Sequence, residues 1–319
     1  MSTAYFSHPD CLMHEMGESH PESPARLHAI EDQIIASGLS GLIAYRDAPL
    51  ASIDEIRRVH SEAVLERIRT NLPTPGETGY FGLDADTLIN AHSWRAALRA
   101  AGAAVAATDA VITGEFNTAF CAVRPPGHHA TPNASMGFCL FNNVAIAIHH
   151  AFAVHGLSRV AVVDFDVHHG NGTEAAFLND PRVLMVSFFQ SPLYPYSGEY
   201  CKGERPPNLV NIPVPAYTRG DRVRELIHRD WLPALHAHRP EMIFISAGFD
   251  AHREDELASM GLTESDYAWI TRQLVALAAQ YAQGRIVSCL EGGYHLSALG
   301  RSVVAHLKAL AGLANDRFA

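Results

Sequence analysis

Residues 159–173 read RVAVVDFDVHHGNGT, an apolar run of β-branched residues that ends in carboxylates, histidines and glycines. Such a run predicts a strand over residues 159–166 that is buried on both faces of a sheet. Side chains two positions apart on a strand share a face, so we expect Asp164, Asp166 and His168 to point the same way. Two buried carboxylates beside an imidazole are costly without a cation or hydrogen-bond donors, which favours a metal site over a simple turn cluster.

Further apolar runs alternate with helical patterns along most of the chain. The predicted strands cover residues 120–123, 183–189, 242–247 and 285–290. The predicted helices cover residues 96–113, 141–154, 219–236, 264–281 and 296–313. This alternation is typical of an α/β fold with a parallel sheet covered on both faces. The first 119 residues are less regular and carry two long loops, at 9–24 and 73–86, and loops of that length are often functional.

Composition limits the class of protein. The 319 residues are 48% hydrophobic and 18% charged, which excludes a disordered chain and allows a large buried core. We expect a single domain over residues 1–319, because neither a repeat nor a flexible linker divides the chain. The net charge of −10 disfavours a protein that grips nucleic acid, and the sequence leaves a homo-oligomer open.

Cysteine usage and hydropathy bear on the compartment. The five cysteines are scattered without a CxxC pair, so we expect no disulfide framework and a reducing, cytoplasmic location. The first ten residues lack the basic and apolar regions of a signal peptide. The most apolar stretch, residues 96–113, is interrupted by Arg99 and Asp109, so we expect a packed helix and no membrane contact.

Four predicted strands end in polar residues suited to metal binding or proton transfer. Ligands of open parallel sheets bind beyond the carboxyl ends of the strands, so we expect these endings to converge. They read RPPGHH (124–129), DFDVHHGNGT (164–173), AGFDAH (247–252) and EGGYH (291–295). Asp166, His168 and Asp250 would supply three ligands and leave a position for water, the pattern of a catalytic zinc site, and Fe²⁺ or Co²⁺ would also fit.

The other polar residues at these strand ends suit acid–base and oxyanion chemistry. His128 and His129 could form a general acid–base pair beside the metal, although an isolated pair of histidines is more often structural. Asp164 and Asn171 could orient such imidazoles through their far ring nitrogens. Tyr294 could donate a hydrogen bond to a developing oxyanion. We interpret the following histidines as structural or surface residues: His149, His150, His252, His295 and His306.

Together these motifs resemble the histone deacetylase superfamily, in particular its class II branch and the bacterial histone deacetylase-like amidohydrolases. The matching stretches occur in the family's order and are HPESPARL (20–27), RPPGHHA (124–130), GFCLFNNVAIA (137–147), DFDVHHGNGT (164–173), SAGFDAH (246–252) and LEGGYH (290–295). The resemblance implies an arginase-like three-layer fold around a mostly parallel sheet of about eight strands. It also implies zinc-dependent removal of acetyl groups from amines.

The resemblance assigns roles residue by residue. The family's zinc ligands fall on Asp166, His168 and Asp250. Its catalytic set falls on His128, His129, Asp164, Asn171 and Tyr294. Within that set, His129 is the expected proton shuttle and Asp164 the expected partner of His128. Asparagine at position 171 resembles the class II form, and tyrosine at position 294 indicates a competent enzyme and not a reader of acetyl-lysine.

The resemblance further implies a substrate tunnel and a structural potassium ion. The tunnel would be lined by Gly137, Phe138 and Tyr194, with Leu262 at its gatekeeper position. Potassium would be held mostly by main-chain oxygens, in segments that contain Asp164, Asp166, His168, Ser187 and Phe188.

The resemblance leaves two main alternatives for the substrate. An apolar gatekeeper at Leu262 favours acetyl-lysine in proteins or peptides, and longer acyl groups on lysine stay open. An acetylpolyamine amidohydrolase would need carboxylates at the tunnel rim, for which the candidates are Glu15, Glu18, Asp84, Asp86, Glu254, Asp255 and Glu256. The intact catalytic set disfavours a non-enzymatic binding protein, and the HHGNGT and GGY elements disfavour a ureohydrolase.

Overall fold

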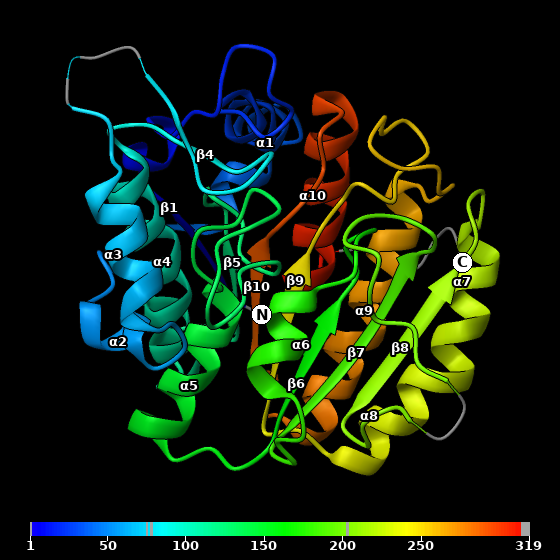
Figure 1. The fold of residues 1–319 in the computed structure, drawn as a ribbon. Coiled ribbons are helices and arrows are strands. Elements are labelled where there is room, and N and C mark those ends of the chain that lie inside the picture. The colour runs from blue at the N-terminus through cyan, green and yellow to red at the C-terminus, as the bar shows by residue number, and fades with distance from the viewer. Residues whose placement is uncertain (1, 75, 77–78, 202–203, 314–319) are drawn as a thin grey trace.

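A computed structural model describes residues 2–74, 76, 79–201 and 204–313 (Figure 1). Its central sheet consists of β1 (Thr3–Ser7), β2 (Ala44–Asp47), β5 (Thr118–Cys121), β6 (Val160–Asp164), β7 (Val183–Gln190), β8 (Leu209–Val214), β9 (Met242–Ala247) and β10 (Ile286–Leu290). The eight strands lie in the order β2-β1-β5-β10-β9-β6-β7-β8, and every neighbouring pair is parallel. A short antiparallel pair, β3 (Phe81–Gly82) with β4 (Leu88–Ile89), stands apart from this sheet. The predicted α/β class and parallel sheet are confirmed.

Helices cover both faces of the sheet and make a three-layer fold. They are α1 (Ala25–Ala36), α2 (Ile53–Arg57), α3 (Glu62–Thr70), α4 (Ser93–Ile112), α5 (Asn143–His155), α6 (Asn171–Phe177), α7 (Gly220–Leu226), α8 (Leu232–His238), α9 (Glu264–Tyr281) and α10 (Leu296–Leu310). Helices α4, α5 and α6 lie on one side of the sheet and α1, α9 and α10 on the other (Figure 1). Among the helices described here, none is both long enough and apolar enough to cross a membrane.

The central strands are buried along their whole length. Every residue of β5, β6, β7, β9 and β10 is buried, which is why these strands have near-continuous apolar sequences. The edge strand β2 reads AYRD and is mostly exposed. The other edge strand, β8, carries an exposed proline at position 213. Strands β1, β2 and β8 were not among the predicted strands. The edge strand β2 lacks an apolar run, whereas β1 and β8 are largely buried and their apolar residues were a signal that the prediction missed.

Two local predictions need correction, and a third lies partly outside the described residues. The predicted strand 159–166 ends at Asp164, so Asp166 and His168 lie in the turn beyond it and do not share a strand face with Asp164. The predicted helix 219–236 is divided into α7, one π-helical turn (Ile227–Trp231) and α8, which has a proline in its first turn. Of the predicted loop 73–86, residues 75, 77 and 78 lie outside the described residues.

The parallel sheet positions the candidate site. The carboxyl ends of all eight strands meet at one edge of the sheet, the upper edge in Figure 1. The four strands with polar endings, β5, β10, β9 and β6, are consecutive neighbours in its centre. Their following turns therefore gather over the middle of one edge, as predicted.

Candidate active site

The three predicted metal ligands lie together at the carboxyl ends of β6 and β9. The ligand atoms of Asp166, His168 and Asp250 all lie within 4.8 Å of one another. His168 Nδ1 is 3.0 Å from Asp166 Oδ1 and 3.2 Å from Asp250 Oδ2. Both carboxylates are buried, so a mixed nitrogen and oxygen donor set is concentrated in a site that excludes most water.

Main-chain donors hold the two carboxylates in place. The N–H of Gly292 donates to Asp166 Oδ2 at 2.8 Å, and the N–H of Val167 donates to Asp250 Oδ1 at 3.0 Å. A Cβ at Gly292 would overlap Asp250 Oδ2 and lie 2.6 Å from Asp166 Oδ2, so only glycine fits there. Asp250 Oδ2 has no hydrogen-bond partner among the described residues. This free oxygen faces His168, where a cation would satisfy it.

The electrostatics of the three residues favour a bound positive charge. Burial and the neighbouring Asp166 raise the pKa of Asp250 to about 6. Burial alone would lower the pKa of His168, but its hydrogen bond with Asp166 and the charges of Asp250 and Asp166 outweigh burial and raise that pKa to about 10. The two carboxylates thus draw a proton onto the imidazole between them, and a divalent cation would replace that proton.

The tandem histidines lie beside this group, and each contacts its predicted partner. His128 Nδ1 lies 3.1 Å from Asp164 Oδ2, and His129 Nδ1 lies 2.8 Å from Asn171 Oδ1. An amide oxygen only accepts, and Asn171 Nδ2 is directed to the sulfur of Met136 at 3.4 Å, so His129 Nδ1 carries the proton. The Nε2 atom of His129 is therefore left with a lone pair that can accept a proton.

The two histidines differ in their affinity for protons. Burial disfavours a charge on His128, but Asp166 and Asp164 outweigh burial and raise its pKa to about 10. Burial, followed by the charges of His128 and His168, holds the pKa of His129 well below its usual value. Their ring centres are only 4.0 Å apart, so a proton on one ring disfavours a proton on the other. The arrangement keeps His128 charged and His129 neutral.

Two carboxylates, Glu291 and Asp255, hold the turns that carry His128 and Tyr294. Neither of them was predicted from the sequence to have a catalytic role. Glu291 is fully buried and accepts the N–H groups of Gly127 at 2.7 Å and His128 at 3.0 Å. Asp255 accepts the N–H of Tyr294 at 2.6 Å and that of the next residue at 3.1 Å. Asp255 is buried and is therefore not a free rim carboxylate, which corrects its candidacy for the tunnel rim. The sequence did offer one signal for Glu291, since this carboxylate directly follows a predicted strand whose end was expected to lie at the site.

Tyr294 lies on a turn that Arg26 contacts and supports. The guanidinium carbon of Arg26 lies 4.9 Å from the centre of the Tyr294 ring, and its Nε donates to the carbonyl of Gly293 at 2.7 Å. Arg26 is itself buried and paired with Glu22 at 3.1 Å. Burial holds the pKa of Tyr294 well above its usual value, so the phenol keeps its proton and can donate a hydrogen bond.

Three of the predicted tunnel residues surround the histidines and the tyrosine. Phe138 meets Tyr294 edge-on at 5.9 Å, and Tyr194 meets His129 edge-on at 5.1 Å. Gly137 adopts φ +55°, and a Cβ there would lie 2.5 Å from Cδ2 of His129. These contacts put aromatic walls next to the candidate catalytic groups.

Leu262 does not occupy the predicted gatekeeper position. It is fully buried in the hydrophobic core, and its main chain pairs with Ala251 and Arg253. A groove of about 460 Å³ runs beside Tyr294, and the residues that line it include Leu257 and Glu256. Leu257 therefore replaces Leu262 as the leucine beside the tyrosine, because the chain between the two turns inward into the core.

The remaining rim candidates lie in different surroundings. Asp84 Oδ1 accepts the N–H groups of Asp86 at 3.0 Å and Thr87 at 2.7 Å, so it supports a turn. Burial, followed by the neighbouring Asp84, raises the pKa of Asp86. Glu254 pairs with Arg301 at 2.9 Å. The other candidates, Glu15, Glu18 and Glu256, are exposed.

Three of the residues predicted near potassium, Asp164, Ser187 and Phe188, lie on the adjacent strands β6 and β7, whereas Asp166 and His168 lie in the turn after β6. Asp164 of β6 is opposite Ser187 of β7 in the strand register. The hydroxyl of Ser187 donates to Asn211 Oδ1 at 3.1 Å, and its carbonyl accepts a long bond of 3.4 Å from the indole of Trp231. Phe188 stacks on that indole with ring centres 5.5 Å apart.

The chain is similar in sequence to a known protein family over most of its length. The sequence model of the histone deacetylase domain family matches residues 20–310. The histone deacetylase-like amidohydrolase of Pseudomonas aeruginosa is 37% identical, over 98% of this chain and 88% of that protein. A probable deacetylase of Archaeoglobus fulgidus is 38% identical, over 98% of this chain and 87% of that protein.

A comparison of folds agrees with the comparison of sequences. The crystal structure of the HDA15 HD domain matches this structure with a TM-score of 0.91 and 32% identity. The match covers 99% of this chain and 91% of that one. The predicted three-layer deacetylase-like fold is confirmed.

Proposed function

Because the chain belongs to the histone deacetylase family of hydrolases, we propose that it is a zinc-dependent deacetylase that acts on acetyl-lysine in proteins or peptides. The observation that carries this proposal is the position of His168 between two buried carboxylates, next to two histidines with separate partners. Strand β1 of the central sheet begins at Thr3 and helix α10, which packs beside that sheet, ends at Leu310, which supports a single catalytic domain.

The donor set suits zinc. Asp166, His168 and Asp250 would hold the ion through one nitrogen and two carboxylates, and the unpartnered oxygen of Asp250 supports this assignment. Zinc bound there would lower the pKa of a water molecule and polarise the acetyl carbonyl. Three protein ligands leave room for that chemistry, whereas a structural zinc site is closed by four.

His129 is the proposed proton carrier. Its Nε2 lone pair is free because Asn171 holds the proton on Nδ1, and its low pKa keeps it neutral at rest. Nε2 would accept the proton that the attacking water loses and then donate it to the nitrogen of the leaving amine. His128, held by Asp164, would stay protonated and supply a fixed positive charge beside the reacting carbonyl.

Tyr294 is the proposed donor to the carbonyl oxygen as negative charge builds on it. Its phenol is protonated, and its turn is held by Asp255 and Arg26. A donor fixed before the reaction stabilises the transition state without reorganisation. The aromatic rings of Phe138 and Tyr194 would pack against the aliphatic stem of a lysine side chain.

An acetylpolyamine is the second candidate substrate. The observation that favours it is Glu256, an exposed carboxylate in the groove beside Tyr294. A distal ammonium group would be attracted to such a carboxylate. Leu257 lines the same groove and offers an apolar contact, which favours acetyl-lysine.

The test is a comparison of kcat/KM for an N-acetyl-lysine peptide and for N-acetylputrescine on zinc-loaded protein. We expect the peptide to be preferred. A strong preference for N-acetylputrescine would overturn acetyl-lysine as the substrate, and Glu256→Gln should then lower kcat/KM for the polyamine alone. Zinc-loaded protein that turns over neither compound would contradict the proposed acyl group or amine.

We also propose a structural potassium ion beside Asp164, Ser187 and Phe188. The weak interaction at the Ser187 carbonyl supports this, since that oxygen can take another positive partner. Replacing potassium with a large organic cation should lower the melting temperature. An unchanged melting temperature would contradict the proposal.

A further inference from the structure

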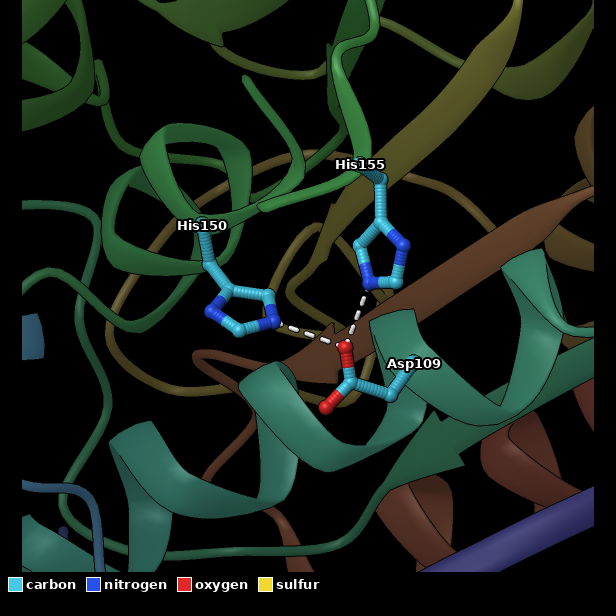
Figure 2. A group of neighbouring side chains, drawn as sticks. All are labelled: Asp109, His150 and His155. Atoms are coloured by element: carbon cyan, nitrogen blue, oxygen red, sulfur yellow. Dashed lines mark hydrogen bonds and ion pairs between the residues drawn. The ribbon is translucent and has the colours of Figure 1, made fainter. Parts of the chain in front are cut away.

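A second group of metal-ligating side chains lies far from the candidate active site. Asp109 is near the end of α4, and His150 and His155 are on α5 (Figure 2). Each of these helices is followed by the start of a strand, β5 after α4 and β6 after α5. The group therefore lies at the amino edge of the parallel sheet, whereas Asp166 and Asp250 follow its carboxyl edge.

The ligand atoms of this group converge on one point. His150 Nε2 is 2.7 Å and His155 Nε2 is 2.6 Å from the same oxygen, Oδ1 of Asp109. Figure 2 shows both rings directed toward that carboxylate. The three ligand atoms lie within 4.8 Å of one another. Two imidazole nitrogens and one carboxylate oxygen form a set that binds zinc and other borderline divalent ions.

We propose that Asp109, His150 and His155 form a second divalent-cation site, separate from the catalytic one. The surroundings are those of a site that is anchored on one side and open on the other. His150 is buried, whereas the side chain of Asp109 is 46% exposed. The open side admits the ion and leaves space for water as a further ligand. A bound ion would link α4 to α5 and so stabilise their packing.

The hydrogen bonds around His150 show what changes when an ion binds. Without it, the Nε2–H groups of His150 and His155 both donate to Asp109, and Arg58 donates to His150 Nδ1 at 3.1 Å. An ion must take the Nε2 lone pairs, so two protons leave or move. The proton of His150 would then sit on Nδ1, where Arg58 can no longer donate. Glu55 Oε1, 3.7 Å from Nδ1, is the carboxylate within reach to accept it.

Arg58 therefore disfavours binding of the ion, whereas Glu55 favours it. The guanidinium favours the wrong tautomer of His150 and repels a cation. The carboxylate favours the metal-binding tautomer, as carboxylates behind metal-ligating histidines generally do. We therefore expect Arg58→Met to tighten the binding of Zn²⁺ at this site and Glu55→Gln to weaken it about tenfold.

The experiment measures zinc bound to the full chain, without an affinity tag, after equilibrium dialysis. We expect two zinc ions per chain in the wild type. His155→Gln and Asp109→Asn should each bind one and keep the wild-type kcat/KM, because neither residue is near the catalytic groups. The matched control is His149→Gln, a change on the same helix at a ring that stacks on Phe177; it should keep two.

The outcomes separate this site from the proposed enzyme function. If the wild type binds one zinc ion and Asp250→Ala binds none, the proposal of a second site is overturned, whereas the proposal of a catalytic zinc site stands. Two ions that persist in both His155→Gln and Asp109→Asn would also overturn it. Weaker zinc binding in Arg58→Met would contradict the tautomer argument. A zinc-dependent rise in melting temperature that His155→Gln abolishes and His149→Gln keeps would support the link between α4 and α5.

Discussion

At the scale of single residues, the chemistry of the site depends on which atom of each side chain already makes a hydrogen bond. Asn171 occupies Nδ1 of His129, and Asp164 occupies Nδ1 of His128. The two rings are chemically identical and burial lowers the pKa of both, yet neighbouring carboxylates raise the pKa of His128 while neighbouring histidines lower that of His129 further. Opposite shifts in adjacent groups indicate which one holds a proton and which one accepts it.

Loss of the Tyr294 hydroxyl should slow turnover without loss of the metal. We expect Tyr294→Phe to lower kcat by roughly 100- to 1,000-fold, the usual effect of removing one oxyanion donor. The measurement is steady-state kinetics together with metal analysis. The phenyl ring keeps its place above Arg26, so the fold should be unaffected. A variant with near-normal kcat would exclude the proposed role.

Loss of the Asp250 carboxylate should empty the catalytic metal site. Asp250→Ala removes one of the three proposed ligands and leaves Asp166 and His168 without the second negative charge. Metal analysis should be done in the His155→Gln background, where only the catalytic ion is expected. We expect less than one zinc per chain and no measurable activity. Full occupancy in that background would show that Asp250 is not a ligand.

At the scale of elements, adjacent strand ends carry the site, and tight turns hold it. The turns after β5, β10, β9 and β6 each contribute a group, and glycines allow the close approaches between them. Gly292 packs closely against both proposed metal-binding carboxylates, and Gly137 against the ring of His129. These positions test whether backbone placement limits catalysis.

A methyl group at Gly137 should displace His129. Gly137→Ala places a Cβ at 2.5 Å from the imidazole and forces alanine into a positive φ. We expect kcat to fall about 100-fold, since a shift of about 1 Å in a catalytic group has that effect. Zinc content should be unchanged. Gly41→Ala is the control, because its Cβ would meet nothing within 4 Å; equal kinetics in the two variants would contradict the steric argument.

At the scale of the whole molecule, buried histidines make the fold sensitive to acid. His306 is fully buried between the hydroxyls of Thr271 at 2.6 Å and Ser288 at 2.9 Å, and burial lowers its pKa to about 3. Burial also lowers the pKa of His14 to about 3 and that of His60 to about 4. In the unfolded chain these groups take up a proton near pH 6.5. The unfolded state therefore binds more protons below that pH.

The free energy of unfolding should accordingly fall as the pH drops from about 6.5 towards 3. Each such histidine contributes a slope of up to about 1.4 kcal/mol per pH unit in this window, and its contribution is fully present above it. His306→Gln keeps a side chain that can bond to the two hydroxyls and should lower the slope by one group. Urea unfolding at several pH values measures this. An unchanged slope would show that His306 does not titrate as described.

The sequence by itself determined the parallel α/β fold, the strands in its centre and the polar turns that follow them. It could do so because strands buried on both faces must be apolar along their length, whereas the strand ends are free to carry chemistry. The edge strand Ala44–Asp47 was not predicted, because a strand exposed at the edge of a sheet need not be apolar.

Only the tertiary structure decided which residues meet. Asp166 and His168 come together through a turn and not through a shared strand face, because the strand ends at Asp164. Leu262 lies in the core while Leu257 lines the groove, a difference that depends on how one loop folds inward. His150 and Asp109 belong to different helices, so their shared hydrogen bond follows from helix packing, which leaves no periodic pattern in the sequence.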